Sequence, residues 1–340
     1  MLNELTRKLV SGKNLSKEEA ENALEYLFDE GSTDRDISNF LIALFEKGET
    51  PEEIAGFAQI MRQHAVRLQS NRTDLVDTAG TGGGKPSFNV STTAAFVVAG
   101  AGIAVAKHGN RAVTSTCGSA DVLEALGVRI DSPIKTVQSC LDRNGLAFLF
   151  APAFHPAMKR VAAIRKQIPH RTIFNLLGPL TNPANAPFQL IGVFEAELVP
   201  KLGKALYLLG TGRSWISHSL DGLDEISVLS PTKIIEVTSD KLHEFEINPV
   251  DYGFSYVSGS LKEGQGGNPA ANAKICLEIL KGERHDFLRD LVLINAAAAI
   301  HLATDKTFDE SLKQAKLSIS GGMAYQKLQE LIETSNHDSG

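Results

Sequence analysis

A short strand, a glycine-rich turn and an apolar helix follow one another between residues 75 and 98, and this succession constrains the fold most. Leu75-Val76 is apolar, the turn reads Gly80-Thr81-Gly82-Gly83-Gly84-Lys85, and Ser91 or Thr92 is expected to cap a helix through Val98. Residues 103–106 then predict another strand, and Ser119 is expected to cap a helix over 121–126. Such alternation is typical of a parallel α/β sheet.

The flanking segments predict helices. Ser16 with Glu19, and Thr50 with Glu53, fit capping boxes, the second with Pro51 at the first helical position. Apolar spacing of three and four residues predicts about four short helices before residue 70, and the chain is expected to be helical again from Pro269. Later strands are expected at 147–150, 189–193, 215–220 and 234–237, with a helix at 198–208.

These patterns predict an all-α part joined to an α/β part. A small N-terminal helical domain over 1–70, joined by a later helical segment near 155–185, should pack on a larger α/β domain over 71–335 with a central, mainly parallel sheet. A length of 340 residues is sufficient for two domains.

Acidic residues are unevenly distributed. The chain carries 40 acidic and 34 basic residues, yet the windows 78–120 and 143–194 contain no Asp or Glu. Because carboxylates repel phosphate, such depletion is what a site for a highly charged anion requires. The net charge of -6 disfavours nucleic-acid binding.

Other global features indicate a soluble, intracellular protein. The sequence has no apolar run long enough for a membrane span and no secretion-signal pattern at its start. Its three cysteines, widely spaced and odd in number, predict reduced thiols in a cytoplasm and no zinc site.

The glycine turn differs from two well-known phosphate loops. A Walker loop needs four residues between Gly and Gly-Lys, but three separate Gly80 from Gly84, and Pro86 follows the lysine. A dinucleotide fingerprint needs glycine where Lys85 stands. Backbone N–H groups and the following helix can still bind an anion, so the turn predicts a phosphate site of another kind.

Two further motifs lie at predicted strand ends, where α/β sheets bind ligands. Lys107-His108-Gly109-Asn110-Arg111 offers cations for phosphate, a glycine that allows close approach, and an amide that both donates and accepts. Asp224-Glu225 is either a solvated acidic turn or a Mg2+ site, and a polyphosphate site elsewhere favours Mg2+. In the second window, most of Lys159, Arg160, Arg165 and Lys166 are expected on a solvated helix face, with one arginine suited to a substrate carboxylate.

Together these motifs resemble the anthranilate phosphoribosyltransferase family. The resemblance runs in order along essentially the whole chain and includes Asn89-x-Ser91-Thr92, the arginine after His155-Pro156-x-Met158, and Asn175-Leu176-Leu177-Gly178-Pro179-Leu180. It implies a nucleoside phosphorylase/phosphoribosyltransferase-like fold and a Mg2+-dependent pentosyltransferase in the cytoplasm. The implied reaction, in tryptophan biosynthesis, moves the phosphoribosyl group of phosphoribosyl pyrophosphate to anthranilate and releases pyrophosphate.

The resemblance also implies roles for particular residues. Arg165 would pair with the anthranilate carboxylate near Asn110, His108 would line the entry, and Ser91, Asp224 and Glu225 would engage the metals. Lys107, Ser91, Asn110 and Arg165 would be catalytic. The chain would form a homodimer through the helical domain. Gly109 would also bind substrate. The residues implied to hold the phosphoribosyl donor are Gly80, Thr81, Gly82, Gly83, Asn89, Ser91, Thr92, Lys107 and Ser119.

One position departs from the family pattern. The family has aspartate after Gly-Thr-Gly-Gly, whereas this chain has Gly84 and a segment to Phe88 one residue shorter. We expect weaker Mg2+ dependence or faster product release. The alternatives are a phosphoribosyltransferase with another acceptor, a nucleoside phosphorylase on the same architecture, and a non-catalytic paralogue that binds nucleic acid.

Overall fold

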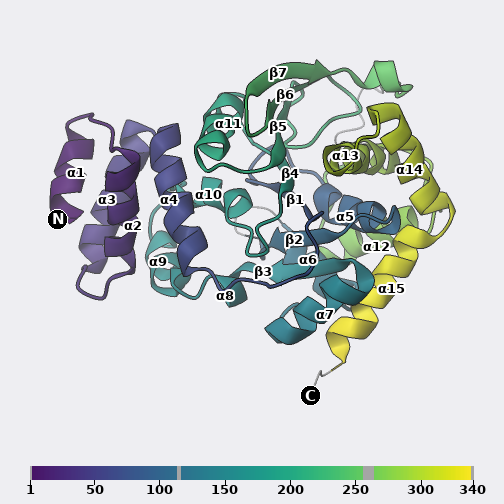
Figure 1. Ribbon diagram of the computed structural model, residues 1–340, viewed down its shortest axis with the longest axis horizontal. Coiled ribbons are helices and arrows are strands. Elements are labelled where there is room, and N and C mark those ends of the chain that lie inside the picture. The colour runs from purple at the N-terminus through teal and green to yellow at the C-terminus, as the bar shows by residue number, and fades with distance from the viewer. Residues whose placement is uncertain (1, 113–115, 256–263, 338–340) are drawn as a thin grey trace.

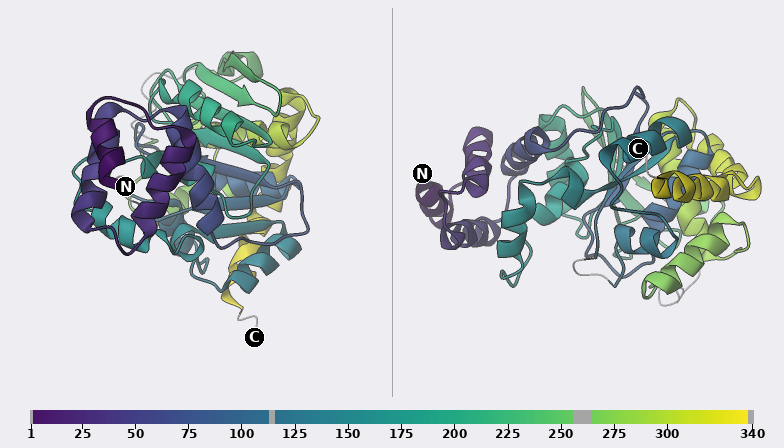
Figure 2. Two further views of the ribbon diagram at one scale, coloured as in Figure 1. Left: turned by 60° about the vertical axis from the view of Figure 1, so that its left-hand side comes forward. Right: turned by 90° about the horizontal axis from the view of Figure 1, so that it is seen from below.

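The structure is a computed structural model that describes residues 2–112, 116–255 and 264–337. It consists of an N-terminal group of helices and a larger α/β part built around one sheet (Figure 1). Figure 2 shows the N-terminal helices at one end of an elongated molecule and the C-terminal helices at the other. Among the described residues, no helix is long and apolar enough to cross a membrane.

The N-terminal helices begin where the capping residues predict. Thr50 accepts from Glu53 N, the Glu53 side chain returns to the Thr50 backbone, and Pro51 opens α4; Ser16 and Glu19 form the same box at α2. Both predicted capping boxes are therefore confirmed. The four helices are α1 (Leu2–Val10), α2 (Lys17–Phe28), α3 (Asp34–Lys47) and α4 (Pro51–His64).

A seven-stranded sheet in the order β3-β2-β1-β4-β5-β6-β7 forms the centre of the α/β part. The pairs among β1 to β5 are parallel, whereas β6 and β7 are antiparallel additions at one edge. The expectation of a mainly parallel sheet is confirmed. The strands are β1 (Val76–Gly80), β2 (Val105–Gly109), β3 (Leu146–Phe150), β4 (Phe188–Gly192), β5 (Arg213–Ser219), β6 (Thr232–Val237) and β7 (Leu242–Ile247).

Helices cover both faces of this sheet (Figure 1). On one face, α5 and α13 lie beneath α14 and α15, and on the other α11 lies between the sheet and α4. The helices of the α/β part are α5 (Val90–Gly100), α6 (Ser119–Ala125), α7 (Ile134–Asn144), α8 (Ala151–Phe154), α9 (Met158–Arg165), α10 (Phe174–Leu177), α11 (Leu198–Leu208), α12 (Pro269–Leu280), α13 (Phe287–Ala303), α14 (Phe308–Ser320) and α15 (Met323–Asn336). Short 3-10 turns are η1 (Gly178–Leu180) and η2 (Pro249–Tyr252).

Two capping expectations are wrong. Helix α5 starts two to three residues earlier than expected, with Asn89 at its N-cap, so Ser91 and Thr92 lie inside its first turn. Helix α6 has Gly118 at its N-cap, and Ser119 is its first residue. In both cases the hydroxyl side chain has another partner, because Ser91 Oγ accepts from Lys107 and Ser119 Oγ donates to Asn110 O.

Two hydrophobic clusters meet at the sheet. The first contains α5, α13 and the sheet face that carries Trp215. The second contains helices α1 to α4 together with α9, α10, α11 and the opposite sheet face, which carries Ile191, Ile216 and Ile235. The N-terminal helices therefore share a core with one face of the sheet.

Candidate active site

The glycine turn follows β1 and bends back over the carboxyl ends of β1 and β4. Thr81 N donates to Gly192 O at 2.9 Å, and Gly82 and Gly83 have positive φ angles of 63° and 88°. A Cβ on Gly83 would lie 2.3 Å from an Arg171 nitrogen. The turn therefore needs glycine both for its conformation and for close contact with its neighbours.

Asp224 and Glu225 lie directly against this turn. A Cβ on Gly80 or Gly84 would lie 3.2 or 2.9 Å from an Asp224 carboxylate oxygen, and Ser87 Oγ donates to Glu225 Oε1 at 2.9 Å. Burial raises the pKa of Asp224, and burial together with the Asp224 charge raises the pKa of Glu225 well above its usual value. Glu225 Oε2 is buried and has no hydrogen-bond partner among the described residues.

This pair fits a hard divalent cation. Two adjacent buried carboxylates, one with an unpaired oxygen, are oxygen ligands of the kind that Mg2+ prefers. The described residues contain no group of three or more His, Cys, Asp or Glu with metal-binding geometry. Substrate phosphates would then supply further ligands, as is usual for Mg2+. Ser91 Oγ bonds to Lys107 and makes no hydrogen bond with either carboxylate in the described structure.

Lys107 lies in β2 and reaches towards the carboxyl end of β1. Its Nζ donates to Thr78 O and, at 3.3 Å, to Ser91 Oγ. Burial lowers the pKa of Lys107 to about 8 and raises that of Asp77, its buried counter-charge, to about 6. Both groups are therefore charged at pH 7. Asp77 is held by Asn182 Nδ2 at 2.7 Å and by His108 N at 3.2 Å.

The other residues predicted to hold the phosphoribosyl donor lie at the start of α5, the end of β2 and the start of α6. Asn89 Nδ2 donates to Cys117 O and its Oδ1 accepts from Asn272, so its side chain ties the start of α5 to α12. Thr92 is buried within α5. Gly109 ends β2 where a Cβ would lie 2.2 Å from Ser119 Oγ, which explains the glycine.

Arg165, His108 and Asn110 line one cavity of about 550 Å³. Its walls come from α4, the end of β2, α8 to α10 and η1, and none of its lining residues is acidic. Arg165 Nη2 donates to Asn175 Oδ1 at 3.3 Å and its guanidinium lies 5.0 Å from the centre of the Phe174 ring. Among the described residues Arg165 has no carboxylate partner, so its charge is available for an anionic group in the cavity.

Two histidines in this cavity are held uncharged. His108 Nδ1 donates to Gly178 O at 3.0 Å, and the His108 and His155 rings lie 5.1 Å apart. Burial lowers the pKa of His108 to about 3 and that of His155 to about 4. The cavity therefore presents Arg165 beside neutral polar and apolar walls at pH 7.

The basic residues of the second acid-free window separate into different environments. Lys159 lines the cavity with Arg165, whereas Arg160 binds Asp29 O and Ser32 O at the N-terminal helices, and Lys166 is exposed. Arg171 was not predicted from the sequence; it donates to Gly83 O at 3.0 Å, and its guanidinium lies 3.6 Å from the centre of the Phe194 ring. Its position in the acid-free window was the available signal.

Family models match nearly the whole chain. A model described as the glycosyl transferase family, a/b domain, covers residues 72–325, and one described as the glycosyl transferase family, helical bundle domain, covers residues 3–65. These matches and the fold define a two-domain glycosyl transferase.

Similar proteins and solved structures identify the family within the glycosyl transferases. The chain is 47% identical to an anthranilate phosphoribosyltransferase of Pelotomaculum thermopropionicum, covering 98% of this chain and 96% of the relative. The crystal structure of anthranilate phosphoribosyltransferase from Thermus thermophilus is 38% identical, with a TM-score of 0.91, covering 98% and 99% of the two chains. The Saccharomyces cerevisiae structure, in complex with PRPP and Mg, is 30% identical, with a TM-score of 0.89, covering 98% and 97%. The chain belongs to the anthranilate phosphoribosyltransferase family.

Proposed function

We propose that this chain transfers the 5-phosphoribosyl group of phosphoribosyl pyrophosphate to the amino group of anthranilate, releasing pyrophosphate, in tryptophan biosynthesis. The observation that carries the proposal is the end of β2, where Lys107 bonds to Thr78 and Ser91 and His108 lines the Arg165 cavity. Successive strand residues point to opposite sides, so one strand end serves both substrates.

The donor is proposed to lie over the glycine turn. The glycine turn is proposed to let the phosphates approach closely, while the start of α5 and Lys107 offer donors and positive charge for them. Asn89, Ser91, Thr92 and Ser119 are proposed to complete this site, and Gly109 is proposed to bind substrate at the end of β2. Mg2+ is proposed at Asp224 and Glu225, with Ser91 nearby, where it would neutralise charge on the leaving pyrophosphate.

Anthranilate is proposed to occupy the Arg165 cavity. Arg165 would bind its carboxylate, and Asn110 and His108 would contact the ring and amine. The amine is neutral and needs no strong base, which agrees with the neutral state of His108 and His155. The barrier lies in positive charge that develops at the ribose C1 as pyrophosphate leaves, so positioning and electrostatic stabilisation are the main catalytic terms.

The experiment is the loss of anthranilate fluorescence on mixing with protein, phosphoribosyl pyrophosphate and Mg2+. We expect a loss that requires all components and that falls at least about a hundredfold in rate for Lys107→Ala, because an electrostatic contact of this kind contributes about 2.7–4 kcal/mol. Donor-dependent thermal stabilisation without fluorescence loss would indicate another acceptor. Salt-sensitive retention on DNA without donor binding would favour the nucleic-acid-binding alternative.

The domain division and assembly are part of the same proposal. Residues 1–70, joined by the helical segment near 155–185, are proposed as the helical domain, and 71–335 as the donor-binding domain. A homodimer through the helical domain is supported by the exposed Val10 and Phe45 side chains on α1 and α3. Sedimentation of the wild type as a dimer and of a Val10→Asp/Phe45→Asp variant as a monomer would test it. A cytoplasmic location is proposed on the three unpaired cysteines.

A further inference from the structure

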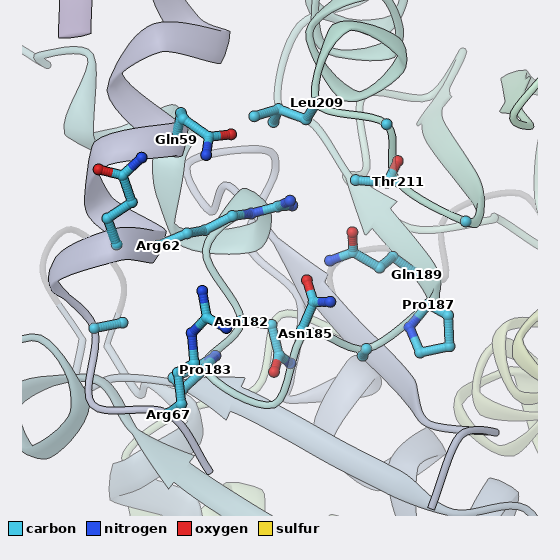
Figure 3. Close-up of a pocket in the computed structure, with 15 residues that line it drawn as sticks. Gln59, Arg62, Arg67, Asn182, Pro183, Asn185, Pro187, Gln189, Leu209 and Thr211 are labelled. Atoms are coloured by element: carbon cyan, nitrogen blue, oxygen red, sulfur yellow. The ribbon is translucent and has the colours of Figure 1, made fainter. Parts of the chain in front are cut away.

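A second cavity lies at the N-terminal ends of β4 and β5, the end of the sheet opposite the glycine turn. It has a volume of about 330 Å³ and is bounded by the end of α4, the segment before β4, and the turn between α11 and β5 (Figure 3). Its polar lining includes Gln59, Arg62, Arg67, Asn182, Asn185 and Gln189. The whole lining of the cavity contains two arginines, Arg62 and Arg67, and no acidic residue. Several of its members belong to the second acid-free window, which the catalytic site does not fully explain.

Arg62 supplies a cation without a carboxylate partner. Its Nε donates to Leu180 O at 2.7 Å, and its terminal nitrogens have no hydrogen bond or ion pair within the part of the chain that the structure describes. Burial lowers the pKa of Arg62 to about 10, so the guanidinium stays charged at neutral pH. Figure 3 shows this guanidinium directed into the cavity, with Arg67 on the same side. The two terminal nitrogens of a guanidinium can donate parallel hydrogen bonds to the oxygens of one anion.

Gln189 supplies a buried acceptor without a donor. The residue is 2% exposed, and its Oε1 has no partner among the described residues. Its Nε2 donates to Pro179 O at 2.7 Å, and this bond fixes the amide orientation, because the reverse orientation would bring two carbonyl oxygens together. A buried acceptor left unpaired is unfavourable, so a ligand that offers an N–H or O–H should bind better than one that does not.

The electrostatic balance favours an anion. The carboxyl ends of α4 and α11 face the same region and contribute about half an elementary negative charge each. The two guanidinium groups contribute a full positive charge each, so their total positive charge exceeds the partial negative charge of the two helix ends. The volume allows a small molecule, since one water occupies about 30 Å³ in the liquid.

The cavity is separate from the proposed catalytic site. Gly178 and Thr181 line the Arg165 cavity, whereas Leu180 O binds Arg62 and Asn182 lines the second cavity. The segment 178–182 therefore forms a wall between the two.

We propose that this second cavity binds a small oxyanion, a phosphate or a carboxylate, that also carries one hydrogen-bond donor. Arg62, assisted by Arg67, binds the anionic oxygens, and Gln189 Oε1 accepts from the donor. Hydrogen phosphate and hydroxy-carboxylates have this combination of groups, whereas sulfate and acetate have only the anionic oxygens.

Equilibrium dialysis on the full chain tests the proposal with two matched pairs of labelled anions, phosphate against sulfate and glycolate against acetate. We expect one site for phosphate or glycolate whose affinity falls about tenfold or more in Arg62→Met, because the charged hydrogen bonds to the anion are lost. Binding of phosphate alone would identify a phosphate ligand, and binding of glycolate alone a carboxylate ligand. Phosphate that also binds over the glycine turn is unaffected by Arg62→Met, so only the difference between wild type and variant counts.

The control is Arg7→Met, which removes an exposed arginine on α1 and should leave binding unchanged. Arg62→Lys keeps the charge and stem if Arg62→Met does not fold, and it should still weaken binding because the paired nitrogens are lost. The absence of any site sensitive to Arg62 would overturn the proposal. Sulfate and acetate binding as tightly as their partners would also overturn it, because Gln189 would then have no role.

Discussion

Gly84 shows how a single missing side chain can change metal use. A Cβ at this position would lie 2.9 Å from Asp224 Oδ1, so an aspartate there would add a third carboxylate beside Asp224 and Glu225. Without Mg2+ the three like charges repel, and with Mg2+ they provide an additional ligand. We expect Gly84→Asp to increase the rise in Tm caused by Mg2+ and to lower the half-saturating Mg2+ concentration for turnover roughly threefold to tenfold, which is up to about 1.4 kcal/mol.

Gly84→Asn is the matched variant, because it has the same shape and meets the same oxygen without adding charge. It should not increase the Mg2+-dependent rise in Tm. Identical Mg2+ titrations for wild type and Gly84→Asp would show that the missing aspartate is unrelated to metal use.

His155 predicts a pH dependence of stability. Burial lowers its pKa to about 4 in the folded chain, whereas in the unfolded chain it titrates near 6.5. The unfolded state therefore binds the proton first, so stability is complete above about pH 6.5 and decreases as the pH falls towards 4. Between pH 7 and pH 5, protonation of this one residue in the unfolded state should lower the free energy of unfolding by about 2 kcal/mol. Urea unfolding should show that between pH 7 and pH 5 the free energy of unfolding falls by about 2 kcal/mol less in His155→Gln than in wild type.

The exposed His337 offers the control for this measurement. His337→Gln should retain the wild-type loss between pH 7 and pH 5. If His155→Gln retained it as well, protonation of other groups would account for the acid sensitivity.

Strand ends and the turns that follow them set the geometry of the catalytic region. Gly192 ends β4 where a Cβ would lie 1.5 Å from Asp224 O, a backbone atom that cannot rotate away. We expect Gly192→Ala to displace the turn at 221–225, to destabilise the fold by about 1–3 kcal/mol and to raise the Mg2+ requirement. Gly31→Ala is the control, since its Cβ would meet nothing closer than 3.4 Å. Wild-type Mg2+ use in Gly192→Ala would contradict the proposed role of this contact.

Local sequence signals predicted the elements whose ends depend on local contacts. The capping boxes at Ser16 and Thr50 and the apolar segments of β2 to β6 are of this kind. Strand β7 was not predicted, because it is an edge strand whose residues are mostly exposed and polar. The start of α5 was misplaced, because Asn89 bonds across the fold to Cys117 and Asn272 while Ser91 meets Lys107. Such tertiary partners cannot be read from neighbouring residues.

The same distinction applies to the candidate site. Lys107, Asn110 and Arg165 were predicted because they belong to sequence motifs, and the structure places Asn110 and Arg165 in one cavity. Asp77 was not predicted. It is the buried counter-charge of Lys107 and accepts from Asn182, which lies 105 residues away in the chain, and neither contact is visible in the local sequence. Gln189 likewise appeared only as part of a strand.

The two cores of the chain are joined through the sheet. Strand β5 places Trp215 in the core on the α5 side and Ile216 in the core shared with the N-terminal helices. Phe57 of α4 belongs to the second core, where it lies 6.2 Å from Phe40 and 6.0 Å from Phe174, measured between ring centres. Because α10 and the sheet contribute to this core, loss of packing at α4 should be transmitted to the α/β part.

We therefore expect the chain to unfold as one cooperative unit. Trp215 is the only tryptophan, so its fluorescence reports on the α/β part, while far-ultraviolet circular dichroism reports on all helices. At fixed protein concentration the two urea transitions should coincide, and Phe57→Ala should shift both to lower urea by an equivalent of about 3–5 kcal/mol. Leu317→Ala, at a side chain of α14 that is 63% exposed, should shift neither. A Phe57→Ala variant whose circular dichroism changes early while Trp215 fluorescence keeps its wild-type midpoint would instead show that the N-terminal helices unfold independently, and the shared core would then stabilise the helices without coupling them to the sheet.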